Sequence, residues 1–384
     1  LPMPNTDLRL DSLQTPALLL DERKMMCNLR RLADHIEGTG ATLRPHLKTV
    51  KSVDAARRIL TEDLGPATVS TLKEAEVFAD QGVRDIIYAV GITPHKLDRV
   101  AAIRANGCNL AVILDSLDQA HAVAEASDSL DDAIPALIEL DCDGHRSGLA
   151  PNDLKLVEIG KVLNDGAAEL RGVLTHAGES YEVYGRAAHA KCAEEERHAA
   201  VQAAELLRAN GLPCPVVSIG STPTAHAIEN LEGITEVRAG VYSFFDLVQA
   251  GIGVCDIDDI ALSVLTTVIG HQPDKSWIIT DAGWMAMSRD RGTAGQKIDQ
   301  GYGLVCDEAG VILKDLVMIS ANQEHGVVAL RAGSAQSLPD LPVGTRLRIL
   351  PNHACATAAQ FDAYHVVPAT SDEPLGYWPR FGGW

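Results

Sequence analysis

DIIYAVGITPHKLDRVAAIRANGCNLAVILD, residues 85–115, opens and closes with a short apolar run, and a helix-length amphipathic segment lies between the two. The runs, 85–90 and 109–115, are rich in apolar and β-branched residues, and residues 95–105 form the amphipathic segment. A strand, a helix and a second strand in this order are typical of a right-handed βαβ unit with parallel strands. This stretch therefore predicts parallel sheet.

The same alternation extends in both directions from this stretch. The strand-like runs are residues 41–49, 67–72, 85–90, 109–115, 134–141, 170–176, 216–220 and 236–241. Helical segments between them include residues 53–60, 73–81, 95–105 and 187–209. Eight such runs in succession favour a closed (β/α)8 barrel over an open doubly wound sheet.

The pattern changes after about residue 251, where strand-like runs follow one another with short connectors and helical signals nearly vanish. These runs are residues 260–270, 276–281, 310–319, 326–331 and 346–350. We therefore expect an α/β barrel over residues 14–250, followed by an all-β C-terminal domain over residues 251–384. Residues 1–13 could join the second domain.

Charge and cysteine content narrow the class of protein. The 384 residues carry 33 Lys and Arg against 52 Asp and Glu, a net charge of −19, which disfavours nucleic acid and anionic membranes as partners. The 8 cysteines are scattered without a CxxC pair and are expected to be reduced thiols. With no signal peptide and no apolar run of about 20 residues, a cytoplasmic protein is expected.

RPHLKT, residues 44–49, ends the first strand-like run. Functional residues of a barrel lie at the C-terminal ends of its strands, so Lys48 is expected at the barrel mouth. A lysine amine there can attach an aldehyde cofactor covalently and later act as a base. A single lysine after a turn is also often just a solvated side chain, so a functional role for Lys48 depends on the neighbouring motifs.

GSTPT, residues 220–224, follows the seventh run. Its backbone N–H groups and hydroxyls suit a phosphate, and many barrels bind phosphate after strands seven and eight. RAGVY, residues 238–242, could complete this site at the eighth run. A plain turn is the alternative.

PNHAC, residues 351–355, follows the last strand-like run. Side chains two apart on an extended chain point to the same side, which would pair His353 with Cys355. Imidazole and thiolate together suit Zn²⁺, and only two protein ligands would leave positions for water or substrate. A buried cysteine near a satisfied histidine is the alternative.

Taken in order, these motifs resemble those of the fold-type III pyridoxal-phosphate (PLP) enzymes, the alanine-racemase-like group. Within it the chain is similar to the D-serine dehydratase and D-threonine aldolase family, above all to its bacterial 3-hydroxyaspartate dehydratases. The likeness covers nearly the whole chain and rests on RPHLKT, VSTLKEAE, DGHRSG, LTHAGESY, GSTPT, RAGVY, WMAMSRDRGT, NQEHG and PNHAC.

The resemblance implies PLP as cofactor, a divalent metal (Zn, Mn or Mg), a homodimer, and a role for each matching residue. Lys48 would carry PLP and act as the catalytic base. The residues that would bind PLP are Lys48, Arg146, Tyr181, Ser221, Thr222, Gly240 and Val241. His353 and Cys355 would hold the metal.

The implied reaction removes water from a β-hydroxy D-amino acid, and D-threo-3-hydroxyaspartate would give oxaloacetate and ammonia. Leu174 stands where animal D-serine dehydratases have a tyrosine, which weighs against D-serine as the substrate. His353 and Cys355 stand where the aldolases have His-x-Asp, which favours a dehydratase. D-serine dehydratase, D-threonine or 3-hydroxy-D-aspartate aldolase, racemase and a non-catalytic PLP carrier remain alternatives.

A 3-hydroxyaspartate enzyme must also bind a second carboxylate, which needs a fixed cation. Arg289 and Arg291 are candidates because a guanidinium can pair with a carboxylate through two parallel hydrogen bonds. Ion pairs with Asp290 or other nearby acids are the alternative role for these two arginines.

Overall fold

A computed structural model of the chain describes residues 9–60, 64–144, 146–368 and 373–384. The chain divides into two compact units. Residues 30–240 with 383–384 are called the barrel unit here, and residues 1–29 with 241–382 are called the β unit. Of the quoted motifs and ranges, residues 1–8, 61–63, 145 and 369–372 lie outside the described residues.

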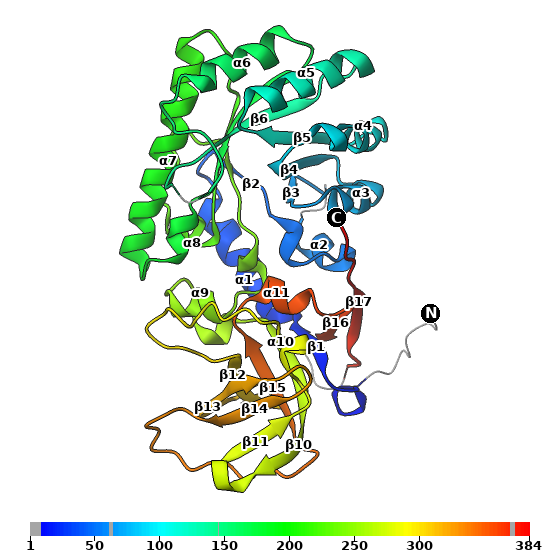
Figure 1. Cartoon of the computed structure of the whole chain (residues 1–384), viewed down its shortest axis with the longest axis vertical. Helices are drawn as coiled ribbons and strands as arrows, with labels where there is room; N and C mark the ends of the chain where they lie inside the picture. The colour runs from blue at the N-terminus through cyan, green and yellow to red at the C-terminus, as the bar shows by residue number, and fades with distance from the viewer. Residues whose placement is uncertain (1–8, 61–63, 145, 369–372) are drawn as a thin grey trace. The chain divides into compact units, whose positions relative to one another are not determined.

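Eight parallel strands form the centre of the barrel unit (Figure 1), in the order β2-β9-β8-β7-β6-β5-β4-β3. They are β2 (Thr42–Leu43), β3 (Ala67–Val69), β4 (Asp85–Gly91), β5 (Asn109–Leu114), β6 (Pro135–Leu140), β7 (Glu169–Thr175), β8 (Val216–Ile219) and β9 (Glu236–Val237). A parallel bridge between His46 and Thr68 joins the segment after β2 to β3, so the first and last strands of this order meet. Each expected run overlaps one of these strands, and the predicted fold class is confirmed.

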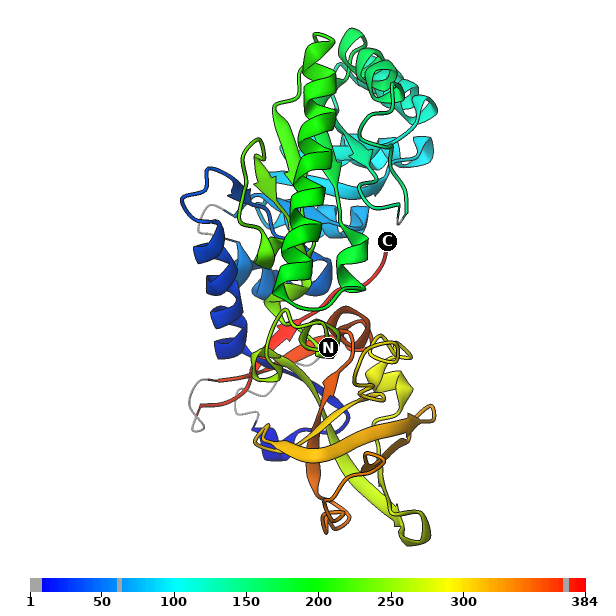
Figure 2. The ribbon, with the colours of Figure 1, turned by 90° about the vertical axis from the view of Figure 1, so that its left-hand side faces the viewer.

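Helices follow the strands in the barrel unit, as expected from the alternation. They are α1 (Glu22–Ile36), which begins in the β unit, α2 (Val53–Ile59), α3 (Leu72–Asp80), α4 (Leu97–Ala105), α5 (Leu117–Leu130), α6 (Lys155–Asp165), α7 (Arg186–Ala209) and α8 (Thr222–Ala227). Hydroxyl caps begin several of them: Thr71 accepts from the N–H of Glu74 at the start of α3, which satisfies a donor that the helix leaves unpaired. The 24 residues of α7 form the longest helix, drawn in green in Figure 2.

The N-terminal ends of the barrel strands are held by a buried arginine. Arg44 donates to Asp85 at 2.9 Å and to Glu236 at 2.6 Å, and also to the backbone oxygen of Ala67 at 3.3 Å. These partners begin β4, β9 and β3, so one guanidinium ties three strand starts together. Apolar side chains of the sheet strands form a hydrophobic core, and one buried cluster in it consists of Ile87, Ala111, Ile113, Leu137 and Leu174.

A nine-stranded sheet forms the β unit, in the order β11-β14-β13-β12-β15-β10-β1-β16-β17. The strands are β1 (Ala17–Asp21), β10 (Leu262–Gln272), β11 (Trp277–Thr280), β12 (Gly303–Asp307), β13 (Ile312–Ala321), β14 (Gly326–Leu330), β15 (Arg346–Pro351), β16 (Ala363–Val367) and β17 (Gly376–Pro379). A further pairing of β11 with β10 closes the six strands from β11 to β10 into a ring. An all-β C-terminal domain was expected and is present.

Three features of the β unit differ from expectation. The expected boundaries placed residues 14–29 and 241–250 with the barrel, but both segments belong to the β unit, where β1 pairs antiparallel with β10 and parallel with β16. Strands β12, β16 and β17 were not expected at all. Three short helices are also present: α9 (Leu247–Gly251), α10 (Trp284–Met287) and α11 (Ala354–Ala358).

Short 3-10 turns complete both units. They are η1 (Leu10–Ser12), η2 (Leu47–Thr49), η3 (Pro94–Lys96), η4 (Gly178–Tyr181), η5 (Val241–Ser243), η6 (Ile257–Asp259) and η7 (Pro273–Lys275).

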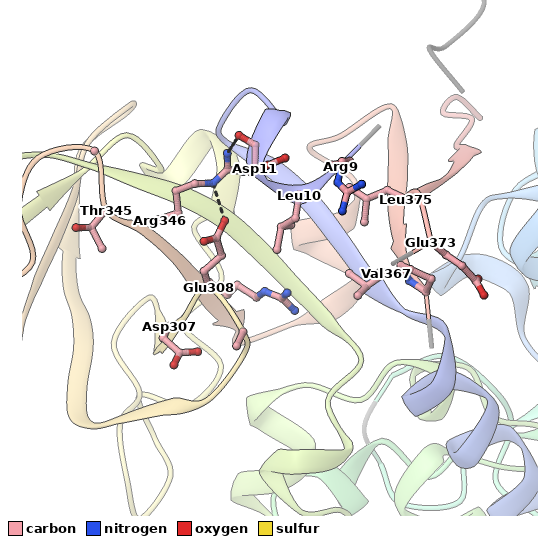
Figure 3. A pocket seen from close by; sticks show the side chains of 14 residues that line it. Arg9, Leu10, Asp11, Asp307, Glu308, Thr345, Arg346, Val367, Glu373 and Leu375 are labelled. Carbon is pink, nitrogen blue, oxygen red and sulfur yellow. Dashed lines mark hydrogen bonds and ion pairs between the residues drawn. The ribbon is translucent and has the colours of Figure 1, made fainter. Parts of the chain in front are cut away.

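A pocket opens in the β unit between η1, β15 and the end of β16 (Figure 3). Arg346 lies on its wall, 3.2 Å from the Glu308 carboxylate and 2.9 Å from the backbone oxygen of Asp11. None of the residues expected to bind PLP, metal or substrate lines this pocket. The expected site residues therefore lie elsewhere in the fold.

Candidate active site

Lys48 lies in η2, the 3-10 turn Leu47–Thr49 that follows β2. The expected strand over 41–49 is therefore wrong at its end, where the chain turns. The turn forms because His46 caps it: its Nδ1 accepts from the N–H of Lys48 at 3.4 Å. Leu47 and Thr49 are fully buried while Lys48 is exposed. The amine is thus presented outward from an anchored turn.

His176, at the end of β7, is a residue that the sequence reasoning did not assign to the site. Its Nδ1 lies 2.8 Å from the backbone oxygen of Gly220. Burial, helped by the charges of Arg146 and Lys48, lowers the pKa of His176 to about 3. The ring is therefore neutral near pH 7, Nδ1 carries the proton that it donates to Gly220, and Nε2 is an acceptor.

His46, which caps the turn that carries Lys48, is affected by some of the same charged groups. Burial and the charge of Lys48 lower the pKa of His46 well below its usual value, and the charge of Arg238 adds to this effect. His46 Nε2 also lies 3.3 Å from the Ser70 hydroxyl. Strand-end residues of β2, β7 and β9 therefore meet around Lys48. The PHLK and THAG motifs were the available sequence signals for these histidines.

The expected phosphate loop follows β8 and begins α8. Ser221 caps the helix by accepting from the N–H of Thr224 at 3.2 Å, and its hydroxyl also bonds Ser180 at 2.8 Å. The Thr222 hydroxyl is buried and has no hydrogen-bond partner in the described structure, as a group reserved for a ligand would be. Gly220 has φ +140°, and a Cβ there would lie 2.0 Å from the backbone oxygen of Arg238. Only glycine fits at this position.

Three further expected PLP residues lie around this loop or follow it in sequence. Tyr181 ends η4, with its ring centroid 6.1 Å from that of His176. A Cβ on Gly240 would lie 3.1 Å from the backbone oxygen of His46, so Gly240 packs directly on the lysine turn. Val241 is the next residue in sequence and begins η5 in the β unit.

Arg146 and Arg238 provide positive charge in the barrel unit. Arg146 is exposed in the loop after β6. Arg238 is buried, donates to the Ser218 hydroxyl at 2.6 Å and also to the backbone oxygen of Thr175, and burial lowers its pKa to about 10. Arg238 begins the RAGVY motif, which was expected to complete the phosphate site, but it was not itself predicted as a PLP-binding residue.

Glu196 on α7 was missed altogether. Its carboxylate is buried and accepts from the N–H groups of Ala177 and Gly220, both at 2.9 Å, and from the Thr224 hydroxyl at 2.8 Å. It therefore fixes the ends of β7 and β8. The available signal was helical spacing, because Glu196 shares the buried face of α7 with Ala193 and Ala200.

The expected metal pair lies in the β unit, although not on an extended segment. His353 is the N-cap residue of α11 and Cys355 lies in its first turn. The reason given for the pairing, alternation along a strand, is therefore wrong. The pairing itself is present, because the His353 side chain hydrogen-bonds Cys355.

Two carboxylates accompany the pair. Asp290 Oδ2 lies 2.6 Å from His353 Nδ1. Asp246 is buried and accepts from the N–H of Ala354 at 2.9 Å. Burial disfavours a charged His353, but the bonds to Asp290 and Cys355 and the charges of Cys355 and Asp246 outweigh it and raise its pKa to about 11. This anionic setting favours a cation at the pair.

The residues present fit a divalent metal with an open coordination sphere. Asp290 occupies Nδ1 of His353, which leaves Nε2 and the Cys355 sulfur as one nitrogen and one sulfur donor. Among the described residues, no group of three or more His, Cys, Asp and Glu could hold a metal. Further ligands would be water or substrate.

Arg289 and Arg291 flank Asp290 but differ in their contacts. Arg291 forms an ion pair with Asp299 at 2.8 Å and stacks over Tyr302 at 5.0 Å. Arg289 is exposed and stacks over Trp284 at 5.0 Å. Asp290 bonds His353, and the alternative role, an ion pair with a nearby acid, is confirmed for Arg291 by its contact with Asp299. Within the described structure only Arg291 of the two has a carboxylate partner.

Membrane insertion through a helix finds no support in the described part of the chain, where no helix is both long and apolar enough to span a bilayer.

Comparisons with known proteins agree with this architecture. The family profile described as "Alanine racemase, N-terminal domain" matches residues 20–248, and the one described as "Putative serine dehydratase domain" matches residues 261–367. The D-threo-3-hydroxyaspartate dehydratase of Delftia sp. (strain HT23) is 53% identical over 97% of this chain and 98% of that protein. The D-serine dehydratase of Dictyostelium discoideum is 26% identical over 93% of this chain and 94% of that protein.

The solved structure of the Delftia enzyme matches with a TM-score of 0.95 at 53% identity, covering 98% of this chain and 100% of that chain. Two variants of D-threo-3-hydroxyaspartate dehydratase match at TM-scores of 0.95 and 0.94, both 52% identical over 98% of this chain and over 97% and 100% of theirs. One carries alanine for a histidine, and the other, in the metal-free form, carries alanine for a cysteine two positions later. The chain therefore belongs to the alanine-racemase-like family, in the group that carries the serine dehydratase domain.

Proposed function

We propose that this protein is a PLP- and divalent-metal-dependent dehydratase that acts on a β-hydroxy D-amino acid. The favoured substrate is D-threo-3-hydroxyaspartate, with oxaloacetate and ammonia as products. The observation that carries the proposal is the His353–Cys355 pair with its imidazole fixed by Asp290 at 2.6 Å, in a chain whose barrel presents Lys48. The similarity to the Delftia enzyme of that name supports the choice of substrate.

The barrel unit offers what PLP binding needs. Lys48 would attach the cofactor, and the unpaired, buried Thr222 hydroxyl with Ser221 would face its phosphate. Tyr181, Gly240, Val241 and Arg146 would complete the binding residues. When bound, PLP withdraws electrons from the substrate and so acidifies its Cα–H.

The residues of this chain would then move the protons. The Lys48 amine would take the proton from Cα of the substrate. His353 and Cys355 would hold the metal that supports departure of the β-hydroxyl, since hydroxide alone is a poor leaving group. The metal-free form of a dehydratase variant that lacks a cysteine supports this assignment. Zinc suits the nitrogen and sulfur donors, with Mn²⁺ and Mg²⁺ as the other candidates.

Substrate choice would depend on a cation for the second carboxylate. Arg289 is the better candidate of the two arginines, because Arg291 already pairs with Asp299. D-Serine, which lacks that carboxylate, is the second candidate substrate, and relatives named as D-serine dehydratases favour it. We also propose a homodimer, as the family resemblance implies, and a cytoplasmic location.

The test combines a product assay with cofactor mapping. The purified protein is offered D-threo-3-hydroxyaspartate, D-serine and D-threonine, and keto acid, ammonia and aldehyde are measured. Oxaloacetate and ammonia from the first substrate are expected, and glyoxylate or acetaldehyde would instead indicate an aldolase. Borohydride reduction followed by peptide mapping should find the cofactor on Lys48, and its recovery on another lysine, or on none, would overturn that assignment.

A further inference from the structure

Asp290 is in direct contact with His353 of the proposed metal pair but is not itself a proposed ligand. Its Oδ2 lies 2.6 Å from His353 Nδ1, and its Oδ1 accepts from the N–H of Gly292 at 2.9 Å. The second bond closes a tight turn within the loop, which fixes the plane of the carboxylate. Asp290 is thus itself held in place while it holds the histidine.

The contact selects one form of the imidazole. A metal ligand must be a neutral imidazole with a single N–H, and when a metal replaces the proton on Nε2, the carboxylate at Nδ1 accepts the N–H that remains. We propose that Asp290 is the positioning residue for the metal: it fixes the tautomer and orientation of His353. This inference rests on the proposed role of His353 and Cys355 as metal ligands.

Neighbouring acids cannot take over this role. Asp246 uses both oxygens on backbone groups, the N–H of Ala354 at 2.9 Å and that of Gln249 at 3.0 Å. Asp299 pairs with Arg291 at 2.8 Å. Asp290 is therefore the carboxylate assigned to Nδ1 in the described structure.

The loop that carries Asp290 is also anchored independently of it. The Thr293 hydroxyl donates to Asn352 at 2.6 Å, and Asn352 donates to the backbone oxygen of Gly301 at 2.6 Å. The Thr357 hydroxyl donates to the backbone oxygen of Met287 at 2.8 Å. Loss of the Asp290 carboxylate should therefore leave the loop attached, which makes a substitution informative.

The decisive variant is Asp290→Asn. Its amide oxygen can still accept from the N–H of Gly292, so the turn is kept. Its NH₂ group then faces Nδ1 of His353 and drives the imidazole proton to Nε2, the atom needed for metal. Asp299→Asn is the matched control, because it makes the same chemical change in the same loop without touching His353.

Metal affinity is measured by titrating chelator-stripped protein, with PLP retained, with Zn²⁺ or Mn²⁺ against a chromophoric chelator. Asp290→Asn should bind about 10- to 100-fold more weakly than wild type, the usual effect of losing such a partner. Asp299→Asn should bind like wild type. Melting temperature and the visible absorbance of PLP, recorded on each sample, should be unchanged in Asp290→Asn.

Wild-type affinity in Asp290→Asn would overturn the positioning role and leave the metal proposal intact. An equal loss in Asp299→Asn, or a fall in melting temperature and absorbance together, would also overturn it, because the loop and not the imidazole would then be responsible. If wild type binds no metal, or if His353→Ala binds as wild type does, the proposed metal pair itself fails.

Discussion

The protonation of the site histidines in this protein depends on burial and on the charged groups around each of them. The imidazoles of His46 and His176 are kept neutral by burial and by nearby cations, so both can accept or donate hydrogen bonds without carrying charge. His353 has the opposite setting, because two carboxylates and a thiol surround it. Histidine thus has cationic neighbours in the barrel unit and anionic neighbours in the β unit.

His176 should make stability depend on pH. Its pKa is lowered from 6.5 to about 3, so the unfolded chain binds the extra proton first as pH falls. Stability from this group is therefore complete above pH 6.5 and is lost between there and about pH 3, with a slope of up to about 1.4 kcal/mol per pH unit. His176→Asn, which keeps a donor for the backbone oxygen of Gly220, should flatten this slope.

Urea unfolding between about pH 4 and pH 7 measures the effect. Part of the slope should remain in His176→Asn, because the pKa of His46 is also lowered. The exposed His121 provides the control variant, His121→Asn, which should retain the whole slope. Parallel slopes in wild type and His176→Asn would contradict the prediction.

Arg289 should discriminate between substrates. If it pairs with the second carboxylate, Arg289→Gln should lose roughly 1.5–3 kcal/mol of transition-state binding, or about tenfold to more than a hundredfold in kcat/KM for D-threo-3-hydroxyaspartate. D-Serine should be affected much less. Arg291→Gln, which breaks the ion pair with Asp299, should affect both substrates alike. Equal losses with the two substrates in Arg289→Gln would place the second carboxylate elsewhere.

Among the helices, α7 acts directly on the candidate site. It runs along the barrel, and its one buried carboxylate, Glu196, reaches the loops after β7 and β8. These loops carry His176 on one side and Ser221 and Thr222 on the other. The position of the phosphate loop thus depends on a helix that contributes no atom to the expected binding residues.

Glu196→Ala should destabilise the protein and weaken PLP binding together. Two buried N–H groups and a hydroxyl lose their acceptor, at about 1–3 kcal/mol for each buried donor left unpaired. Glu196→Gln should be much milder, because its Oε1 can accept both N–H groups while its Nε2 donates to Thr224. Urea unfolding and PLP titration measure both effects.

The neighbouring Glu195 is exposed, and its 3.6 Å ion pair with Lys191 is of the weak surface kind. Glu195→Ala is therefore the control and should change stability by a few tenths of a kcal/mol. A loss in Glu195→Ala equal to that in Glu196→Ala would mean that helix α7, and not the buried carboxylate, is responsible.

In the whole molecule, every proposed PLP-binding residue except Val241 belongs to a different unit from the proposed metal pair. Lys48, Ser221 and Thr222 lie in the barrel unit, and His353 and Cys355 lie in the β unit. Each set is held by hydrogen bonds within its own unit, as Glu196 and Asp246 illustrate. Binding of PLP and binding of metal should therefore be separable properties.

Chelation tests this separation. Removal of metal should abolish dehydration while the visible absorbance of PLP stays, because none of the barrel residues proposed to bind PLP is a proposed metal ligand. His353→Ala should behave in the same way, and Lys48→Ala should lose the absorbance but keep its metal affinity. Full activity in metal-free protein would remove the metal from the mechanism, and loss of colour on chelation would contradict the separation.

Local sequence patterns were sufficient to predict much of the architecture. Apolar β-branched runs and amphipathic segments set the eight barrel strands, since period and length are properties of neighbouring residues. The expected ligands Lys48, Thr222 and His353 were found for a similar reason: polar motifs at strand ends stand out against apolar runs. Their roles as ligands remain proposals.

The features that the sequence did not predict depend on contacts between residues far apart in the chain. β1 joins the nine-stranded sheet, where Leu18 pairs with Val264. The local sequence around residue 18 does not indicate a strand partner so distant in the chain. Asp290 meets His353 across 63 residues, and Glu196 meets Gly220 across 24. A buried carboxylate is stable only where donors converge on it, and that convergence exists only once the chain has folded.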